Sequence, residues 1–582
     1  MRKQIVRREF SEVNVNSLHA LHPLLRRIYA ARQVQSPEAL DRELQHLLPF
    51  SSLLGIEEAV RLLVIAIEKN QKIVIVGDFD ADGATSTAVA VRALRSFGAT
   101  HVHFLVPNRF VHGYGLTPEL VAVAANDGSP HLIMTVDNGI ANHAGVMAAK
   151  ALGCKVIITD HHLPAATLPK ADAIVNPNQP GDTFQSKHLA GVGVIFYVML
   201  ALRRQLSSEG WFEKKRLPEP NMSRLLDLVA LGTVADLVQL DHNNRILVHQ
   251  GLRRIRAGQC IPGIVALLEL ADRDFSRAVA SDLGFAVAAR LNAAGRLDDM
   301  SLGIECLLCD DAARVRQFAR TLNQLNEERK SIEKDMQVQA LTALNQFNAT
   351  GVYESGQKEL PKGLCLFDES WHQGVIGILA SRIKDRFHRP VIVFAPGQDG
   401  EIKGSARSIA GLHIRDVLAF IDAQYPELIH KFGGHAMAAG LTIAHHSFEL
   451  FAKAFDEIVS ARVTDEQLQH NLMSDGELLA EEFNLETAAL LRDAGPWGQA
   501  FPEPSFDGCF GILEQRIVGD KHLKLRLAKE DKVIDAMAFF VDTDEWPNHR
   551  CQSVRAVYRL DINEYKNRRN IQLIIEHMEA VI

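Results

Sequence analysis

The pattern of apolar and polar residues predicts several buried strands in the first half of the chain. Short runs of mostly apolar, often β-branched residues lie at 73–76, 132–136 and 156–159. Such runs are typical of strands buried on both faces of a parallel sheet. Helix-like stretches lie between them, at 84–97, 117–126 and 141–152. This alternation predicts a doubly wound α/β domain over residues 51–310, preceded by an N-terminal extension at 1–50.

Two further elements are predicted in the middle of the chain. Residues 311–348 are mostly helix formers, and 311–347 contain neither proline nor glycine, which favours one long helix bridging two domains. A second, smaller α/β unit is expected at 349–462, where apolar strands surround a helix that begins near Gly374. This unit contains a glycine-rich turn, Gly433-Gly434-His435.

The last part of the chain, residues 463–582, alternates with period two. His522, Lys524 and Arg526 lie on one face of a predicted strand, and leucines lie on the other. A predicted hairpin follows, with strands at 554–561 and 570–575. This pattern favours a small antiparallel β-barrel of the OB type, although any half-exposed sheet alternates in a similar way.

Composition narrows the class of protein. The 582 residues are too many for one hydrophobic core, and the content of 47% apolar and 23% charged residues is typical of globular domains. The longest apolar run, 191–202, is too short to cross a bilayer, and no signal core follows the basic N-terminus. The seven cysteines suggest no disulfide framework, and the pair Cys306 and Cys309 lacks a second pair for zinc. We therefore expect a cytoplasmic protein.

Each of the three buried strands runs directly into acidic residues. The side chains that follow them are Asp78, Asp80 and Asp82, then Asp137, then Asp160 with His161 and His162. In a parallel sheet these strand ends share one crevice. So many carboxylates remain ionised together only if cations neutralise them. Three aspartates on one loop could be an ordinary acidic turn, but the matching strand ends favour a metal site that holds two ions.

The net charge of −8 argues only weakly against nucleic-acid binding. Several of the negative charges belong to the predicted metal site, where divalent ions would cancel them. The distribution of charge is therefore more informative than its sum.

Together with a fourth acidic segment at 226–236, these strand ends match, in order, the four motifs of the DHH phosphoesterase superfamily. Over nearly its full length the chain resembles the bacterial single-stranded-DNA exonucleases of that superfamily. The resemblance includes Trp371 and His372, and the Gly433-Gly434-His435 turn of a DHH-associated domain.

The resemblance implies that six residues hold two Mn²⁺ or Mg²⁺ ions: Asp78, Asp80, Asp82, Asp137, His161 and Asp236. Oxygen ligands with one imidazole suit Mn²⁺, and Asp137 is the expected bridge. Asp78 stands where many relatives have histidine. The implied catalytic residues are His162, Asp160 and Asp137. Asp227 is a weaker candidate ligand, because a helical salt bridge explains it equally well.

Substrate binding is expected from basic and polar residues outside the acidic crevice: Arg109, Tyr114, Arg290, Asn292, Arg296, Ser405, Arg407, His435, Lys524 and Arg526. Arginine offers bidentate contacts to phosphate, but each arginine could equally form a structural ion pair. Aromatic residues for stacking on bases are few, and the candidates are Tyr565, Trp497 and Phe501.

The resemblance implies a metal-dependent exonuclease that hydrolyses single-stranded DNA from the 5′ end to mononucleotides in DNA repair and recombination. It also implies a monomer that works with single-strand-binding protein and a DNA helicase. One alternative is a small-substrate phosphodiesterase or pyrophosphatase, which would not need the third domain. Another is a non-catalytic DNA-replication scaffold, which would be expected to have lost metal ligands. Nothing in the residues themselves sets the polarity of hydrolysis.

Overall fold

The computed structural model describes residues 3–108, 113–126, 128–350, 360–565 and 568–581. The chain divides into two compact units. One comprises Met1–Val6 and Asn326–Leu472, and the other comprises Arg7–Leu325 and Met473–Ile582. Among the described residues, no helix combines the length and the apolar character needed to cross a membrane.

The larger unit contains a five-stranded parallel sheet in the order β3-β2-β4-β5-β6. Its strands are β2 (Ile73–Val76), β3 (Val102–Leu105), β4 (Leu132–Val136), β5 (Lys155–Thr159) and β6 (Ala173–Val175). Between β2 and β4 the strand order reverses, because β3 lies on one side of β2 and the later strands lie on the other. Such a switch point is where open α/β sheets bind their ligands.

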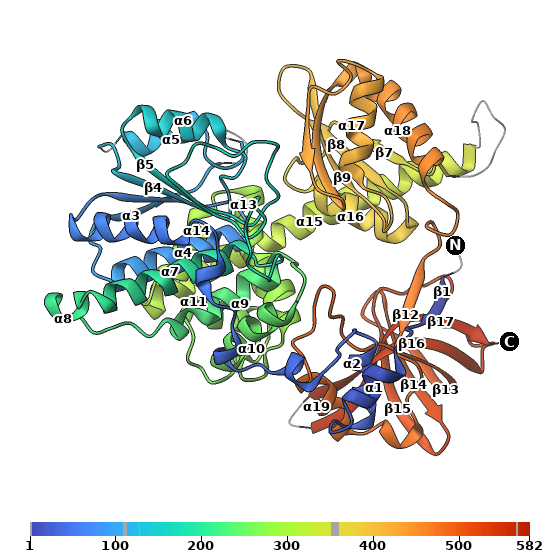
Figure 1. Ribbon diagram of the computed structural model, residues 1–582. Coiled ribbons are helices and arrows are strands. Elements are labelled where there is room, and N and C mark those ends of the chain that lie inside the picture. Colours follow the sequence, from blue (N-terminus) through green and yellow to red (C-terminus); the bar gives the residue numbers. More distant parts are fainter. Residues whose placement is uncertain (1–2, 109–112, 127, 351–359, 566–567, 582) are drawn as a thin grey trace. The chain divides into compact units, whose positions relative to one another are not determined.

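Helices cover both faces of this sheet. The covering helices are α3 (Ile56–Glu68), α4 (Ala81–Ser96), α5 (Pro118–Ala125), α6 (His143–Ala151) and α7 (Gly191–Ser208). Figure 1 shows α5 and α6 on one side of the sheet. Ile73 and Ile75 point into a core shared with α3, α4 and α7, whereas Val74 and Val76 pack with residues of α5 and α6. Two buried faces explain why the strands are apolar at nearly every position.

A group of further helices completes this domain. They are α8 (Trp211–Lys215), α9 (Leu226–Ala235), α10 (His242–Arg256), α11 (Pro262–Leu270), α12 (Ala280–Asp282), α13 (Ala289–Leu297) and α14 (Ser301–Leu308), with a π-helical turn at Leu283–Ala288. The predicted long helix is present as α15 (Ala312–Thr350).

The smaller unit contains a mixed sheet in the order β10-β11-β9-β8-β7. Its elements are β7 (Leu364–Phe367), β8 (Val391–Pro396), β9 (Glu401–Arg407), β10 (Lys431–Gly434) and β11 (Ala438–Ala444), with α16 (Ile376–Phe387), α17 (Ile414–Gln424) and α18 (Phe448–Arg462). Only the pair β7–β8 is parallel among the described strands of this sheet. The predicted second α/β domain is confirmed.

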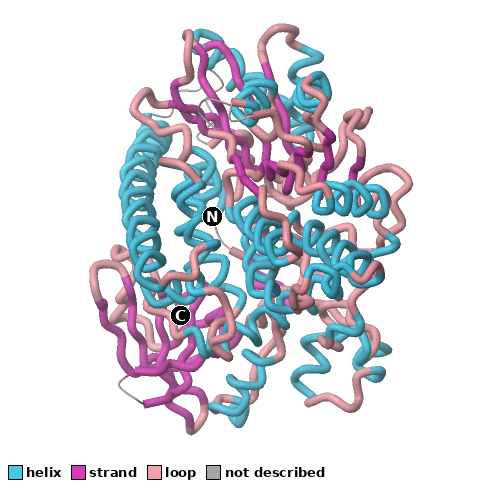
Figure 2. Tube along the Cα trace, turned by 90° about the vertical axis from the view of Figure 1, so that its left-hand side faces the viewer, coloured by secondary structure: helices cyan, strands magenta, loops and turns pink. Residues whose placement is uncertain are grey.

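The C-terminal part forms a closed barrel in the order β13-β14-β15-β17-β16, seen in Figure 2 as a group of magenta strands. Its strands are β13 (Phe506–Val518), β14 (His522–Lys529), β15 (Lys532–Ala538), β16 (Ser553–Tyr565) and β17 (Arg568–Val581). Leu523, Leu525 and Leu527 fill its interior. A five-stranded barrel with one parallel closing pair, β15–β17, is the predicted OB type.

The N-terminal segment packs on the region that precedes the barrel. β1 (Gln4–Arg7) pairs with β12 (Asn471–Ser474), and α1 (Glu12–Ser17) and α2 (Pro23–Ala30) follow. The Tyr29 hydroxyl donates a 2.8 Å hydrogen bond to the Ala494 carbonyl, close to α19 (Leu485–Asp493). Trp497 and Phe501 stack on each other and pack against Tyr29. Phe501 is buried, so the prediction that it stacks on DNA bases is wrong.

Candidate metal centre

The loop after β2 is shaped by close backbone packing. Asp80 caps α4, because its Oδ1 accepts a 2.9 Å hydrogen bond from the Gly83 amide. A Cβ atom on Gly83 would lie 2.6 Å from the backbone nitrogen of Asp78, so only glycine fits there. The carboxylate of Asp82 accepts hydrogen bonds from the amides of Gly191 (2.7 Å) and Val192 (2.9 Å) at the start of α7. The loop is thereby held between the starts of two helices.

The six predicted ligands come together at the carboxyl ends of the strands. Their side chains form overlapping groups whose ligand atoms lie within 4.8 Å of one another: Asp78, Asp80 and Asp137; Asp82, His161 and Asp236; and Asp137, His161 and His162. Nε2 of His161 is 3.2 Å from Oδ1 of Asp137 and 3.4 Å from Oδ2 of Asp236. Asp137 belongs to two of these groups, so its carboxylate lies within reach of both sets of potential metal ligands.

Two buried atoms of this cluster have unused bonding capacity. Oδ1 of Asp137 and Nε2 of His161 have no hydrogen-bond partner among the described residues. Leaving a buried polar atom without a partner costs about 1–3 kcal/mol. A cation held by these atoms would remove that cost, so the donor set fits a divalent metal.

The pKa values of the clustered side chains also favour a bound cation. Burial and the repulsion of Asp236 raise the pKa of Asp82 to about 7, and burial and the repulsion of Asp80 raise the pKa of Asp236 to about 7. Burial also raises the pKa of Asp137. Burial and the charge of His162 lower the pKa of His161, which favours the neutral imidazole that a metal requires. Cations would return the carboxylates to their charged form.

Asp160 serves His162 rather than the ligand cluster. Its Oδ1 lies 2.7 Å from Nδ1 of His162, and its Oδ2 accepts a 2.9 Å hydrogen bond from the Ile140 amide. Burial raises the pKa of Asp160, but the charge of His162 and the hydrogen bond between the two side chains lower this pKa to about 2. Burial lowers the pKa of His162, and Asp160 raises it to about 10. The far nitrogen of the ring, Nε2, lies 3.5 Å from the Tyr114 hydroxyl.

Two asparagines that the sequence reasoning missed hold the backbone of both histidines. The side-chain amide of Asn176 donates to the His162 carbonyl at 2.9 Å, and that of Asn178 donates to the His161 carbonyl at 2.6 Å. The backbone amide of Asn178 also donates to Oδ1 of Asn176 at 2.7 Å. The signal was available, because this Asn-Pro-Asn turn directly follows β6, a further parallel strand of the same sheet.

Asp227 lies apart from the three groups. It is fully buried, and its carboxylate accepts hydrogen bonds from the amides of Leu228 (2.9 Å) and Ile261 (2.7 Å). These bonds tie α9 to the start of α11. Their geometry favours a structural role for Asp227.

The predicted substrate residues of the catalytic domain occupy different environments. Oδ1 of Asn292 accepts a 2.8 Å hydrogen bond from the Ala81 amide, so this side chain holds the acidic loop. Arg290 is buried, and its guanidinium donates to Asn323 Oδ1 (3.0 Å) and to the Ala286 carbonyl (2.8 Å). Arg296, at the end of the same helix α13, is half-buried. Arg109 lies outside the described residues.

The smaller unit carries Ser405 and Arg407 on β9 and His435 after β10. The Arg407 guanidinium donates to the hydroxyls of Ser405 and Ser381, each at 3.2 Å, and to the Ala406 carbonyl at 2.8 Å. Burial lowers the pKa of Arg407. Arg407 is half-buried, and among the described residues no carboxylate pairs with it, which leaves a positive charge suited to an anion. His435 is exposed.

Lys524 and Arg526 lie on the outer face of the barrel, as the period-two pattern predicted. Each has an acidic neighbour: Nζ of Lys524 is 3.8 Å from Asp535, and Nη1 of Arg526 is 2.8 Å from Glu514. This face is therefore of mixed charge rather than uniformly basic. The side chain of Tyr565, the other aromatic candidate of the barrel, lies outside the described part of the chain.

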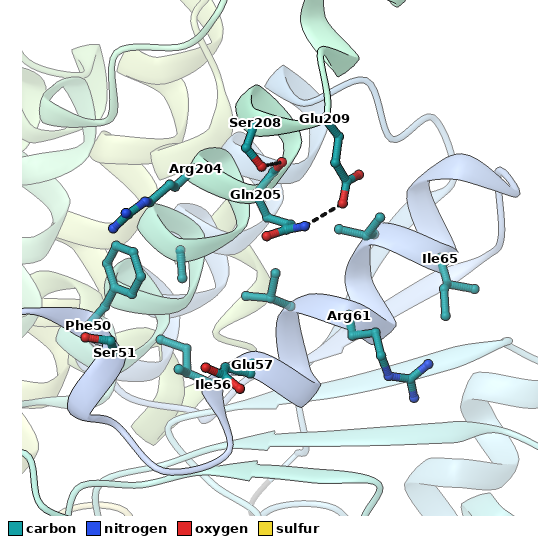
Figure 3. Close-up of a pocket in the computed structure, with 13 residues that line it drawn as sticks. Phe50, Ser51, Ile56, Glu57, Arg61, Ile65, Arg204, Gln205, Ser208 and Glu209 are labelled. Carbon is teal, nitrogen blue, oxygen red and sulfur yellow. Dashed lines mark hydrogen bonds between the residues drawn. The ribbon is translucent and has the colours of Figure 1, made fainter.

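A groove of about 590 Å³ lies between α3 and α7, outside the acidic cluster. Figure 3 shows Ile56 and Phe50 at its apolar part, with Arg61, Arg204 and Glu209 around it. None of its lining residues belongs to the three groups of potential metal ligands. This groove is therefore separate from the cluster of potential metal ligands.

Comparison with known families matches three parts of the chain. Residues 72–233 match the DHH family, N-terminal domain, residues 360–461 match the DHHA1 domain, and residues 474–577 match the RecJ OB domain.

Full-length relatives are similar throughout. The chain is 53% identical to the single-stranded-DNA-specific exonuclease RecJ of Escherichia coli (strain K12) over 99% of both chains, and 50% identical to that of Haemophilus influenzae over 100% of both. Among solved structures, RecJ in complex with Mn²⁺ from Thermus thermophilus is 29% identical with a TM-score of 0.78, covering 100% of this chain and 80% of that one. The corresponding Mg²⁺ complex has a TM-score of 0.74.

Proposed function

The chain belongs to the RecJ family of single-stranded-DNA-specific exonucleases, and on this premise we propose that it hydrolyses single-stranded DNA from the 5′ end to mononucleotides. The observation that carries the proposal is the convergence of six metal-ligating side chains around two buried atoms without hydrogen-bond partners among the described residues. The sequence is 53% and 50% identical, over the full length, to two proteins named single-stranded-DNA-specific exonucleases, and this supports single-stranded DNA as the substrate.

The cluster is suited to two divalent ions, Mn²⁺ or Mg²⁺. Asp78, Asp80 and Asp137 would hold one ion, and Asp82, His161 and Asp236 would hold the other, following the groups in which these side chains lie. Asp137 also lies beside His161, which places it next to both groups. When bound, such ions supply Lewis-acid stabilisation of the charge that develops on a phosphodiester under attack by water.

The chain's own residues do the remaining work. Asp160 anchors Nδ1 of His162, and the opposite ring nitrogen, Nε2, faces the Tyr114 hydroxyl. We assign Nε2 to the phosphate or leaving oxygen of the substrate. His162 holds a proton at Nε2, from which it can pass to that oxygen. Asn176 and Asn178 fix the backbone of the histidine pair, and Asn292 fixes the loop that carries Asp80 and Asp82.

Substrate contacts are assigned to groups with capacity left for phosphate. Arg407, which pairs with hydroxyls rather than carboxylates, is the strongest of the predicted arginines. Arg290 donates to protein acceptors, which favours a supporting role. The residues that stay predicted contacts are Tyr114, Arg296, Ser405, His435, Lys524 and Arg526.

Two alternatives fit less well. A small-substrate phosphodiesterase or pyrophosphatase leaves the C-terminal barrel without a role, and that barrel matches the RecJ OB domain. A replication scaffold without activity would have no need of a complete ligand set, and every predicted ligand position here holds a competent residue.

We further propose a cytoplasmic monomer that acts in DNA repair and recombination with single-strand-binding protein and a helicase. All seven cysteines are free, which is consistent with a reducing compartment.

The test uses purified protein with Mn²⁺ and, separately, with Mg²⁺. Single-stranded DNA labelled at the 5′ or the 3′ end, a blunt duplex and pyrophosphate are offered as substrates. Immediate release of mononucleotide from the 5′ label, slow shortening of the 3′-labelled strand and an inert duplex are expected. Inert DNA together with turnover of pyrophosphate would move the function to the small-substrate branch.

A further inference from the structure

The OB-type barrel carries an exposed aromatic cluster at one end of β14 and β15. Phe539 and Phe540 follow directly after β15, and 51% and 78% of their surfaces are exposed. His522, the first residue of β14, packs edge-on against both, with ring centroids 5.2 and 4.8 Å away. We refer to His522, Phe539 and Phe540 as the aromatic platform. Exposing two adjacent large aromatic rings forgoes the free energy of burial, which favours an interaction site.

The backbone holds this exposure in place. Phe540 has φ of +56°, a left-handed conformation that is unusual for a bulky residue. Its amide donates a 3.2 Å hydrogen bond to Nδ1 of His522, and the Val541 amide donates a 2.9 Å bond to the Lys521 carbonyl. Backbone strain of this kind persists only where its surroundings enforce it, and it gathers at binding sites.

The platform lies on the face of the barrel that OB folds use for oligonucleotides. In the closed order β13-β14-β15-β17-β16, β14 and β15 are the second and third strands, whose outer face commonly binds single strands. Lys524 lies two residues after His522 on the same face of β14. It is paired with Arg516 on the neighbouring strand β13 and with Met537 on β15. Two cations therefore adjoin the aromatic rings.

Charge sets the orientation of a bound strand. Arg516 is exposed and forms no ion pair with another residue of the described part of the chain, and Nζ of Lys524 is 3.8 Å from Asp535. The loop after the platform is acidic, with Asp542, Asp544 and Glu545. Phosphates are thus favoured on the side of Arg516 and Lys524, and bases on the side of the rings.

We propose that His522, Phe539 and Phe540 form a base-stacking subsite for single-stranded DNA, with Arg516 and Lys524 contacting the adjoining phosphates. Stacking on an aromatic face is tolerant of sequence, which suits an enzyme that moves along any strand. The inference rests on the proposed function for the identity of the ligand. The stacking role expected from the sequence for Trp497 and Phe501, which pack on Tyr29, is thereby assigned to aromatic residues that face solvent.

The experiment measures equilibrium binding of the full chain to fluorescein-labelled oligothymidylate in a chelator, so that hydrolysis does not interfere. The oligonucleotide has about 30 nucleotides, more than the roughly 4–16 that one OB fold covers. The double variant Phe539→Ala/Phe540→Ala should bind about 10- to 100-fold more weakly, since each stacked base contributes a factor of this size. Its dependence on salt should equal that of the wild type, because no charge is removed.

Further variants separate stacking from other effects. Phe540→Trp should bind as the wild type does, whereas Phe540→Leu, which stays apolar but cannot stack, should lose affinity. Leu513→Ala removes another exposed apolar side chain of the same barrel and should change nothing. Arg516→Ala/Lys524→Ala should flatten the slope of log affinity against log salt by about 0.7 for each phosphate that the variant no longer neutralises.

The outcomes distinguish this proposal from the function on which it rests. Wild-type affinity in the double alanine variant, or full affinity in Phe540→Leu, would overturn the stacking subsite and leave the patch as a surface for a protein partner. That result would leave exonuclease activity untouched. Loss of affinity in the double variant supports the subsite even if the wild-type enzyme proves inert towards DNA.

Discussion

The side-chain amide of Asn178 donates a 2.6 Å hydrogen bond to the backbone carbonyl of His161, the one imidazole assigned to the metal cluster. The neighbouring Asn176 makes the equivalent bond to His162. A turn with no metal-ligating role thereby sets the positions of two side chains of the predicted site.

Replacing Asn178 by alanine should therefore weaken metal binding. Supporting residues of metal sites typically account for a 10- to 100-fold change in affinity or activity. The Mn²⁺ concentration that gives half-maximal hydrolysis should rise by about that factor, with folding intact by circular dichroism. Asn178→Asp should fail equally, because it keeps the shape but loses the donor. Asn570→Ala, at an exposed position of β17, is the matched control, and an unchanged Mn²⁺ requirement in Asn178→Ala would contradict the positioning role.

Replacing Asp137 by asparagine should abolish hydrolysis and uncouple stability from metal. Because burial and neighbouring carboxylates raise the pKa of Asp137, loss of its charge relieves repulsion in the metal-free protein. Binding of metal at a concentration of about 100 times Kd stabilises the wild type by about 2.7 kcal/mol. Thermal unfolding with Mn²⁺ and with EDTA should thus differ for the wild type and coincide for the variant. A stabilisation by Mn²⁺ that persists in Asp137→Asn would remove this residue from the ligand set.

Arg407 and Arg290 should respond differently to replacement by lysine. Lysine cannot reproduce the fork of contacts that Arg290 makes to Asn323 and Ala286, so Arg290→Lys should lower thermal stability. Arg407→Lys keeps the charge but loses bidentate geometry, and the KM for DNA should rise about tenfold with little change in melting temperature. Circular dichroism melts and steady-state kinetics check both. Equal loss of stability in the two variants would show that Arg407 is structural as well.

The attachment of the N-terminal strand should weaken in acid. Asp507 is buried, which raises its pKa, but hydrogen bonds from Arg7 (2.9 and 3.0 Å) and Ser474 (2.6 Å) outweigh burial and lower it. A carboxyl whose pKa is lowered on folding stabilises the folded state above its unfolded value, about 3.9, and that contribution is lost as the pH falls through the folded pKa.

Hydrogen exchange of β13, corrected for the intrinsic effect of pH, measures this loss. In the wild type, protection at residues around Asp507 should decrease as the pH is lowered below about 4. In Asp507→Asn protection should be weaker at neutral pH, by about 1–3 kcal/mol, and should depend less on pH over the same range. The same acid dependence in both proteins would assign the transition to another carboxyl.

Much of this molecule follows from the order of its residues. The strands at 73–76, 132–136 and 156–159 are apolar at nearly every position because helices bury both of their faces. Such strands can be predicted from the sequence alone. The acidic residues follow those strands directly, and parallel pairing brings strand ends together as a matter of topology. The fold class and the convergence of Asp78, Asp80, Asp82, Asp137 and His161 were predictable for these reasons. Asp236, at the end of α9, follows no strand, and its place in the ligand set was expected from the resemblance to the DHH superfamily.

Other features depend on contacts between segments that are far apart in the chain. Asn178 reaches His161 only because β6 lies beside β5, and Asn292 reaches Ala81 only because α13 packs on the acidic loop. Asp227 has a carboxylate that could bind a metal, yet this carboxylate accepts a hydrogen bond from the Ile261 amide instead. Whether an arginine has spare hydrogen-bonding capacity, as Arg407 does and Arg290 does not, is likewise a property of its neighbours.

The aromatic residues show the difference most clearly. Trp497, Phe501, Phe539 and Phe540 are chemically alike, and no local pattern of period two or 3.6 says which of them faces solvent. Packing against Tyr29 buries Phe501, while the end of β15 and the bond to His522 expose Phe540. The sequence by itself determines the chemical identity and the local periodicity of these side chains. Their burial depends on which other segments of the chain the tertiary structure packs against them.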